Sequence, residues 1–294
     1  MSADKLVDST QLDADLASVA DAIRAKSGGS GQLAFPSGFV SAVAAIPTGG
    51  GGATDPDELA ERSWPSGDVV LDSATIIKSE SFMRCDQMTK ISSDTVTTIR
   101  ACAFGLCRNL GEVSFPNVTS IGSKDGSYGA TGNVFAGCPK LTKIYLPKLT
   151  TVTGNRCFGQ NDSWGGGGVG SSSYPATIAL PALSSLNNQS FRGTGSYFDA
   201  VDFGPNLATI PTDCFYQGTF NALILRKSDA VVSAANADAI KQIKDVWVPQ
   251  SLISGYQTAS NWSARYTAGT ITFHSIEGSI YETKYADGTT IPTT

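Results

Sequence analysis

Charge and histidine are both scarce in this chain of 294 residues. Charged residues make up 16 % of the sequence and the formal net charge is −5 at pH 7, whereas an ordinary soluble domain is about 25 % charged. At this net charge we expect no basic patch, and therefore neither nucleic acid nor a membrane surface as a partner. The single histidine, His274, excludes metal sites with two His ligands and leaves one residue for His-dependent catalysis. We therefore predict no enzyme activity, no catalytic residue, no metal and no cofactor, and we expect His274 to be an ordinary strand residue.

Signals for export and for membrane insertion are also missing. Residues 1–15 have neither a basic start nor a long apolar segment, and no run of about 18 apolar residues occurs. We expect a protein made in the cytoplasm without a signal peptide, where thiols stay reduced. The cysteines contain no C-x-x-C pair, which argues against a zinc ribbon or a thioredoxin-like site. Six buried free thiols are expected, namely Cys85, Cys102, Cys107, Cys138, Cys157 and Cys214.

Glycine and hydroxyl-bearing residues take the place of charge. The chain contains 31 glycines, and 62 of its residues are serine or threonine. Its apolar fraction of 41 % is still high enough to build a core, which excludes global disorder. We therefore expect a neutral, hydroxyl-rich surface over an apolar core.

A repeat organises the middle of the chain. After Phe104 and again after Phe135, apolar residues and one proline recur at identical offsets of 3, 6, 9, 11, 12, 14 and 17 residues. The two copies are Cys107, Leu110, Val113, Phe115, Pro116, Val118, Ile121 and Cys138, Leu141, Ile144, Leu146, Pro147, Leu149, Val152. Frames starting at Phe82, Phe158, Phe191 and Phe215 repeat the pattern with insertions or substitutions. A period of this size indicates one coil of a solenoid.

The chemistry of the repeat predicts the interior of each coil. The V-x-L step places two side chains on one face of a short strand, and the proline after it ends that strand. The Phe, Cys and Leu at steps of three residues suit a tight helical or 3₁₀ turn. Stacked coils should align each Phe over the next in an internal ladder, with Cys85, Cys107 and Cys138 stacked beside it.

The pattern F-x2-C-x2-L-x2-V-x-L-P-x-V-x2-I, over residues 80–225, resembles the BspA-like leucine-rich repeat family. The resemblance implies a right-handed solenoid with parallel sheets, of the kind found on bacterial surface adhesins and on phage or prophage tail proteins. A stretch resembling the cap that often follows such repeats comprises Val246-Trp247-Val248-Pro249, Leu252, Tyr256 and Asn261-Trp262-Ser263.

The N-terminal part differs in pattern from the repeats. Apolar residues at steps of 4, 3 and 4 predict an amphipathic helix for attachment or oligomerisation, formed by Leu12, Leu16, Val19 and Ile23. The alternative is a helical cap on the solenoid. A homotrimer through this stripe is one prediction, although the stripe spans less than two heptads. Residues 20–43, which combine I-R-A-K-S-G with F-P-S-G-F, resemble a module common near the ends of phage tail and baseplate accessory proteins.

The fold class expected is a repeat solenoid, mainly β and leucine-rich-repeat-like, with short parallel strands and tight helical turns. A small α-helical N-terminal module and a small β C-terminal cap complete it. The boundaries are a helical module at 1–47, a glycine-rich linker at 48–54, the start of the solenoid at 55–80, about six repeats at 81–227, a cap at 228–263 and a short β tail at 264–294. The tail should hold antiparallel strands, with a turn near Asp287 and Gly288.

Two insertions are the predicted recognition loops, because insertions in repeats lie at coil corners and often bind. They span about 122–133 and 159–174, and Gly195, Tyr197 and Phe198 are expected to form a smaller excursion. Aromatic rings among Gly, Ser and Asn suit recognition of a sugar or protein surface. The candidate ligand-binding residues are Asn161, Asp162, Trp164, Tyr174, Tyr128, Tyr197 and Phe198. Alternatively, Trp164 and Tyr197 fold back to cover the flank of the solenoid.

We hypothesise a tail-associated protein of a phage or prophage virion, made in the host cytoplasm, that binds a bacterial cell-surface glycan or protein. Its N-terminal module would contact other tail or baseplate proteins. The alternatives are a bacterial surface adhesin, a purely structural tail or baseplate component without a ligand, and an enzyme that cleaves surface polysaccharide. The last would need a carboxylate pair, and no spacing supports Asp125 with Asp162 in that role.

Overall fold

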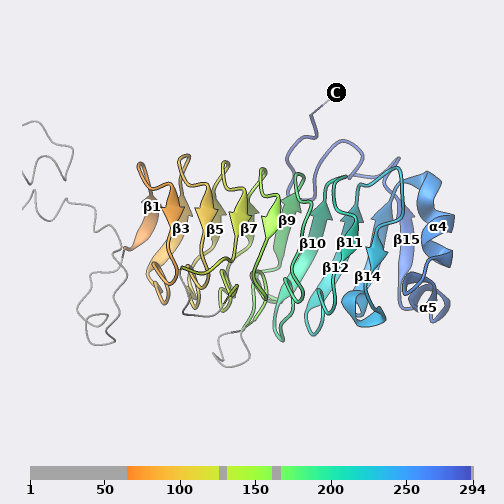
Figure 1. Ribbon diagram of the computed structural model, residues 1–294, viewed down its shortest axis with the longest axis horizontal. Helices are drawn as coiled ribbons and strands as arrows, with labels where there is room; N and C mark the ends of the chain where they lie inside the picture. The colour runs from red at the N-terminus through yellow and green to blue at the C-terminus, as the bar shows by residue number, and fades with distance from the viewer. Residues whose placement is uncertain (1–64, 126–130, 161–166, 293–294) are drawn as a thin grey trace, which may run out of the picture. The chain divides into compact units, whose positions relative to one another are not determined.

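The computed structural model describes residues 65–125, 131–160 and 167–292. The predicted N-terminal module at 1–47 and linker at 48–54 lie outside the described residues. The predicted repeat solenoid is confirmed, because the described residues coil into a parallel β-solenoid in which each turn adds one strand to a large sheet (Figure 1).

A sheet of nine parallel strands forms one face of the solenoid. Its strands follow the chain in the order β1-β3-β5-β7-β9-β10-β12-β14-β15, and the strands that neighbour each other pair in parallel. The bounds are β1 Gly67–Val70, β3 Met88–Ser92, β5 Glu112–Ser114, β7 Lys143–Tyr145, β9 Ala176–Leu180, β10 Tyr197–Phe203, β12 Thr219–Leu225, β14 Ile243–Val248 and β15 Thr272–Ser275.

Two smaller parallel sheets run along another side of the coils. One has the order β2-β4-β6-β8 and the other pairs β11 with β13. Their bounds are β2 Ile76–Ile77, β4 Thr98–Ile99, β6 Ser120–Ile121, β8 Thr151–Val152, β11 Thr209–Ile210 and β13 Ser233–Ala234. The last apolar position of the repeat, Ile121 or Val152, ends these short strands and is buried, so one repeat supplies two strands to the coil.

The predicted phenylalanine ladder forms the centre of the core. Six rings stack in succession with centroid separations of 5.5, 5.4, 5.8, 4.9 and 5.2 Å. They belong to Phe82, Phe104, Phe135, Phe158, Phe191 and Phe215. Backbone hydrogen bonds support the ladder. The N–H of each of the first five Phe residues donates to the carbonyl of the residue that precedes the next ladder Phe, as in Phe104 to Val134 at 2.9 Å.

The C-terminal cap differs from the small β cap expected. Besides β13 and β14 it contains the 3₁₀ helices η1 (Ala237–Ile240) and η2 (Gln250–Leu252) and the helices α4 (Ile253–Thr258) and α5 (Trp262–Thr267). The helices close the last coil with two buried aromatic residues. Tyr256 Oη accepts a hydrogen bond from Val232 N at 3.0 Å, and Trp262 Nε1 donates to Val232 O at 2.9 Å.

The prediction of antiparallel strands in the tail was wrong for β15. This strand pairs in parallel with β14 and so continues the solenoid sheet. The turn near Asp287 and Gly288 is confirmed, with Gly288 at a φ of 85° and an isolated antiparallel bridge between Lys284 and Thr290.

All six cysteines are free and buried, as predicted. The Cys107 and Cys138 thiols contact the carbonyl oxygens of Phe82 and Phe104 at 3.0 and 3.1 Å, one coil back along the ladder. Burial raises the pKa of the Cys85 thiol and of the Cys157 thiol to about 12, so thiolate, the reactive form, is almost absent at neutral pH.

We therefore expect no cysteine of the native protein to react with Ellman's reagent at pH 8 within an hour. In 6 M guanidinium chloride all six should react within minutes. The absorbance of the released thionitrobenzoate gives the number of reacted thiols in the native and in the denatured protein. A thiol that reacts quickly in the native protein would show that its coil opens readily.

Candidate ligand-binding surface

The face of the nine-stranded sheet that points away from the phenylalanine ladder is here called the outer face. Strand residues alternate between the two faces, and the strand register aligns the outward residues into two rows. The first outer row is Asp68, Lys90, Glu112, Lys143, Thr177, Ala200, Ala222, Asp245 and Thr272. The second outer row is Val70, Ser92, Ser114, Tyr145, Ala179, Asp202, Ile224, Trp247 and His274.

The half of the outer face formed by β1 to β9 carries charges of alternating sign. Lys90 Nζ lies 2.7 Å from Glu112 Oε1, and Lys143 Nζ lies 3.8 Å from Glu112 Oε2. These exposed ion pairs contribute little to stability, but they leave the surface close to neutral. Tyr145 stands in the second row with 40 % of its surface exposed.

Residues 276–291, here called the strap, lie over the outer face of β10, β12 and β14. Ile276 packs with the outward side chains of Ala200, Ala222 and Ile224, which are at most 9 % exposed. Tyr281 contacts Trp247 edge to face with 5.1 Å between ring centroids. Outward positions that would otherwise meet solvent therefore belong to a second, smaller core.

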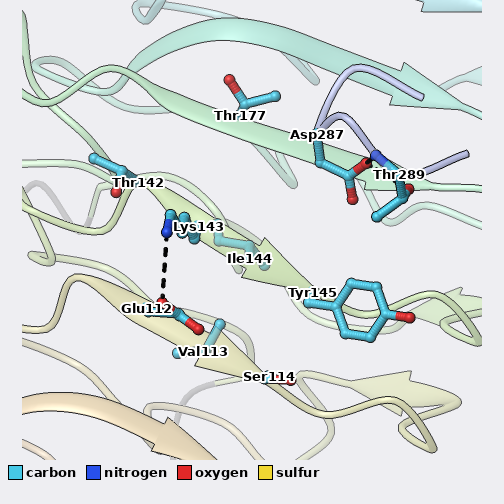
Figure 2. A pocket seen from close by; sticks show the side chains of 10 residues that line it. All are labelled: Glu112, Val113, Ser114, Thr142, Lys143, Ile144, Tyr145, Thr177, Asp287 and Thr289. Atoms are coloured by element: carbon cyan, nitrogen blue, oxygen red, sulfur yellow. Dashed lines mark hydrogen bonds and ion pairs between the residues drawn. The ribbon is translucent and has the colours of Figure 1, made fainter. Parts of the chain in front are cut away.

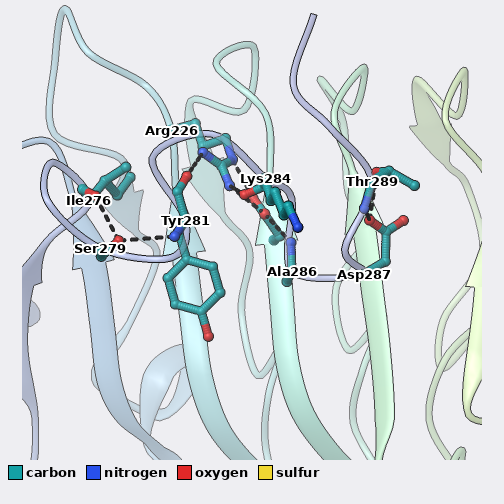
Figure 3. Close-up of polar contacts among 9 residues, drawn as sticks. Arg226, Ile276, Ser279, Tyr281, Lys284, Ala286, Asp287 and Thr289 are labelled. Atoms are coloured by element: carbon teal, nitrogen blue, oxygen red, sulfur yellow. Dashed lines mark hydrogen bonds and ion pairs between the residues drawn. The ribbon is translucent and has the colours of Figure 1, made fainter.

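A buried ion pair fixes the strap to the sheet (Figure 3). Asp202 accepts hydrogen bonds from Arg226 Nε and Nη2, both at 2.8 Å, and from the backbone N–H of Ala286 at 2.9 Å. Arg226 also donates to the carbonyl oxygens of Tyr281 at 2.8 Å and Lys284 at 2.9 Å. Burial raises the pKa of the Asp202 carboxyl, and the hydrogen bonds from Arg226 and Ala286 oppose that shift.

A pocket of about 260 Å³ lies where the strap meets the open half of the outer face (Figure 2). Its floor and one side come from β5, β7 and β9, and the strap supplies Asp287 and Thr289. Asp287 Oδ1 accepts hydrogen bonds from Thr289 N at 3.0 Å and from Thr289 Oγ1 at 2.6 Å. The complete lining is Glu112, Val113, Ser114, Thr142, Lys143, Ile144, Tyr145, Thr177, Asp287 and Thr289.

Three of the residues predicted as ligand contacts are described, and none of them lines this pocket: Tyr174, Tyr197 and Phe198. Tyr128, Asn161, Asp162 and Trp164 lie outside the described residues, as do Leu12, Leu16, Val19 and Ile23. Tyr174 is 45 % exposed and lies at a small turn that Ser171 closes by backbone hydrogen bonds.

The predicted excursion at Gly195, Tyr197 and Phe198 is wrong for Tyr197 and Phe198, because both residues belong to β10. Phe198 is fully buried and stacks on Phe220 with 5.5 Å between centroids, so it cannot contact a surface ligand. Tyr197 is half-buried on the same strand. The insertion at 159–174 also returns to the core, since Val169 is fully buried and bridges Cys138 in parallel.

Lys143, Tyr145 and the strap residues of the pocket are not among the residues predicted from the sequence. A signal for Tyr145 exists in the repeat itself. It occupies the x of the second V-x-L-P step, where strand alternation turns a side chain outward. An aromatic residue at such a position indicates a ring on the protein surface that is available to contact a ligand.

His274 is an outward strand residue of β15, as expected. Its Nε2 lies 2.7 Å from Asp245 Oδ1, and its ring stacks on Trp247 with 4.6 Å between centroids.

Among the described residues, no cluster of three or more His, Cys, Asp or Glu side chains could hold a metal ion. No helix within those same ranges is long and apolar enough to cross a membrane.

Comparison with known proteins gives one family. The model of the BspA type leucine rich repeat region matches residues 75–164 and 172–284 in six copies. No curated protein sequence matches the chain. Among solved structures, the crystal structure of the T. pallidum leucine rich repeat protein (TpLRR) is similar over 70 % of this chain and 85 % of that one, at 10 % identity and a TM-score of 0.38.

Proposed function

The chain belongs to the BspA-type leucine-rich repeat family, whose pattern covers more than half of it, and from this premise we propose that it binds a glycan of the bacterial cell surface without chemical turnover. The observation that carries the proposal is the open half of the outer face. That half is neutral, displays an exposed tyrosine, and contains a pocket lined by hydroxyl and charged groups. Hydroxyl-rich ligands both donate and accept hydrogen bonds, and this mixture of groups offers partners for both.

We further propose that the protein belongs to a phage or prophage tail. The support is the resemblance of residues 20–43 to modules near the ends of tail and baseplate accessory proteins. Antibodies against the solenoid should decorate tails of particles induced from a strain that carries the gene. Labelling of the cell envelope and not of particles would instead favour a bacterial adhesin.

Three tyrosines of nearly equal exposure allow a matched test of the binding surface. Tyr145 on β7 is 40 % exposed, Tyr174 at the end of the insertion at 159–174 is 45 % exposed, and Tyr266 on the cap helix α5 is 41 % exposed. We expect Tyr145→Ala to reduce binding to whole bacterial cells at least ten-fold, since a central aromatic contact contributes about 2 kcal/mol. Tyr266→Ala should leave binding unchanged. Flow cytometry of a panel of bacteria with fluorescently labelled protein gives the affinities.

The Tyr174→Ala variant separates the two candidate surfaces. A loss for Tyr174→Ala with none for Tyr145→Ala would assign binding to the insertion at 159–174. The proposal for the outer face would then be wrong, although the proposed function would stand. Absence of wild-type binding to every strain of the panel would overturn the function itself and favour a purely structural role.

A further inference from the structure

The C-terminal strap ends at the pocket and supplies one of its walls. We infer that the pocket between β5, β7, β9 and the strap binds one sugar residue of a neutral saccharide, and that it exists only while the strap is docked. This inference rests on the proposed function and names the substrate class that the outer face would take. It makes the strap part of the site, whereas a plain solenoid would offer only the open sheet.

The charges around the pocket select against ions. Glu112 and Asp287 would repel an anion such as phosphate, and Lys143 disfavours a cation. A sugar hydroxyl can donate to either carboxylate and accept from the ammonium group. The ligand best matched is therefore uncharged and rich in hydroxyl groups.

The remaining lining suits the ring of a sugar. The Tyr145 ring is exposed enough to lie against its apolar face, and Ser114 and Thr177 offer further hydroxyl partners. A volume of about 260 Å³ is smaller than the 300–1,000 Å³ common for drug-sized ligands. One sugar unit therefore occupies the pocket, and the rest of a glycan extends over the open half of the outer face.

The position of the strap wall depends on the buried ion pair. Ala286, whose N–H donates to Asp202 at 2.9 Å, directly precedes Asp287 in the chain, so the ion pair places the Asp287 carboxylate. Tyr281 anchors the strap from the other side through its contact with Trp247 at 5.1 Å. Tyr281 does not line the pocket, so it acts as a positioning residue.

The test uses the full-length protein and the methyl glycosides of glucose, galactose, rhamnose and N-acetylglucosamine, titrated by NMR. We expect at least one glycoside to bind, with a Kd in the millimolar range. Asp287→Ala, which removes the wall, should weaken that binding at least five-fold. Its matched control is Asp229→Ala, an exposed carboxylate on the loop after β12, which should leave the Kd unchanged.

Tyr281→Ala tests the positioning role without touching the ligand. It should weaken glycoside binding at least five-fold and also speed tryptic cleavage after Lys284, because the strap then leaves the sheet more often. Tyr266→Ala should change neither quantity. If Tyr281→Ala does not fold, Asp287→Ala alone still decides the question.

The inference is overturned if no glycoside binds, or if binding survives both Asp287→Ala and Tyr281→Ala. Its failure can be separated from that of the proposed function. If Tyr145→Ala weakens cell binding and Asp287→Ala does not, the strap takes no part in the binding site, and the proposed function still stands. Glycoside binding by a protein that binds no cells would overturn the proposed function and keep the strap in the sugar-binding site.

Discussion

Phe135→Ala is expected to lower the free energy of unfolding by about 3–5 kcal/mol. Phe135 is fully buried and stacks between Phe104 at 5.4 Å and Phe158 at 5.8 Å. Removing its ring deletes apolar burial, leaves a cavity and breaks two aromatic contacts. Each coil of a solenoid contacts only its neighbours, so the cavity weakens the interfaces on both sides of this coil.

Urea denaturation followed by circular dichroism measures this loss. Phe82→Ala is the matched control, because Phe82 is only partly buried and among the described residues its ring stacks on Phe104 alone. We expect that control to lose about half as much stability, because Phe82→Ala breaks one ring stack instead of two and removes less buried apolar surface. Equal losses for the two variants would contradict the ladder as the source of the stability.

The core of the solenoid could be predicted from the sequence because side-chain type determines it. Phe104 and Phe135 have identical apolar offsets behind them, and stacking identical coils aligns identical residues. The ladder and the buried thiols of Cys107 and Cys138 follow from that alignment alone.

The backbone of each turn could not be predicted in the same way. In each of the six coils that carry a ladder Phe, the residue two places before that Phe has a positive φ, between 52 and 62°. No single residue type occupies this position, which is filled by Glu80, Cys102, Asn133, Arg156, Gln189 and Asp213. Backbone hydrogen bonds between coils, such as Cys102 N to Gly132 O at 2.8 Å, hold this conformation without the glycine that would reveal it in a sequence.

The pocket could not be predicted from sequence patterns, because its lining comes from segments that lie far apart in the sequence. The strap carbonyl of Tyr281 accepts a hydrogen bond from Arg226 across 55 residues, and the N–H of Ala286 donates to Asp202 across 84 residues. One signal was present, however. The runs Ala200-Val201 and Ala222-Leu223-Ile224-Leu225 interrupt the alternation of a half-exposed sheet, and continuous apolar runs indicate strands covered on both faces.

Arg226→Met should cost about 3–5 kcal/mol of unfolding free energy, because it leaves a buried carboxylate without its partner. Asp202 has no exposed surface, whereas the Arg226 side chain retains 11 %, so the acid is the worse group to leave unpaired. The change also removes the hydrogen bonds to the strap carbonyls of Tyr281 and Lys284. Urea denaturation at pH 7 measures the loss, and Arg108→Met, in an exposed ion pair with Asp86, is the control that should cost less than about 1 kcal/mol.

Two further results test whether the carboxylate is the cause. Burial already raises the pKa of Asp202 in the folded chain above its ordinary 3.8, and without Arg226 that pKa rises further. The folded state of Arg226→Met then binds a proton that the unfolded state does not, so its stability should recover as pH falls from 7 through the raised pKa toward 3.8. Adding Asp202→Leu should restore part of the loss at pH 7, because the apolar pair joins Ala200, Ala222 and Ile276 beneath the strap. Purely additive costs for the two substitutions would mean that Asp202 and Arg226 do not stabilise the strap as a pair.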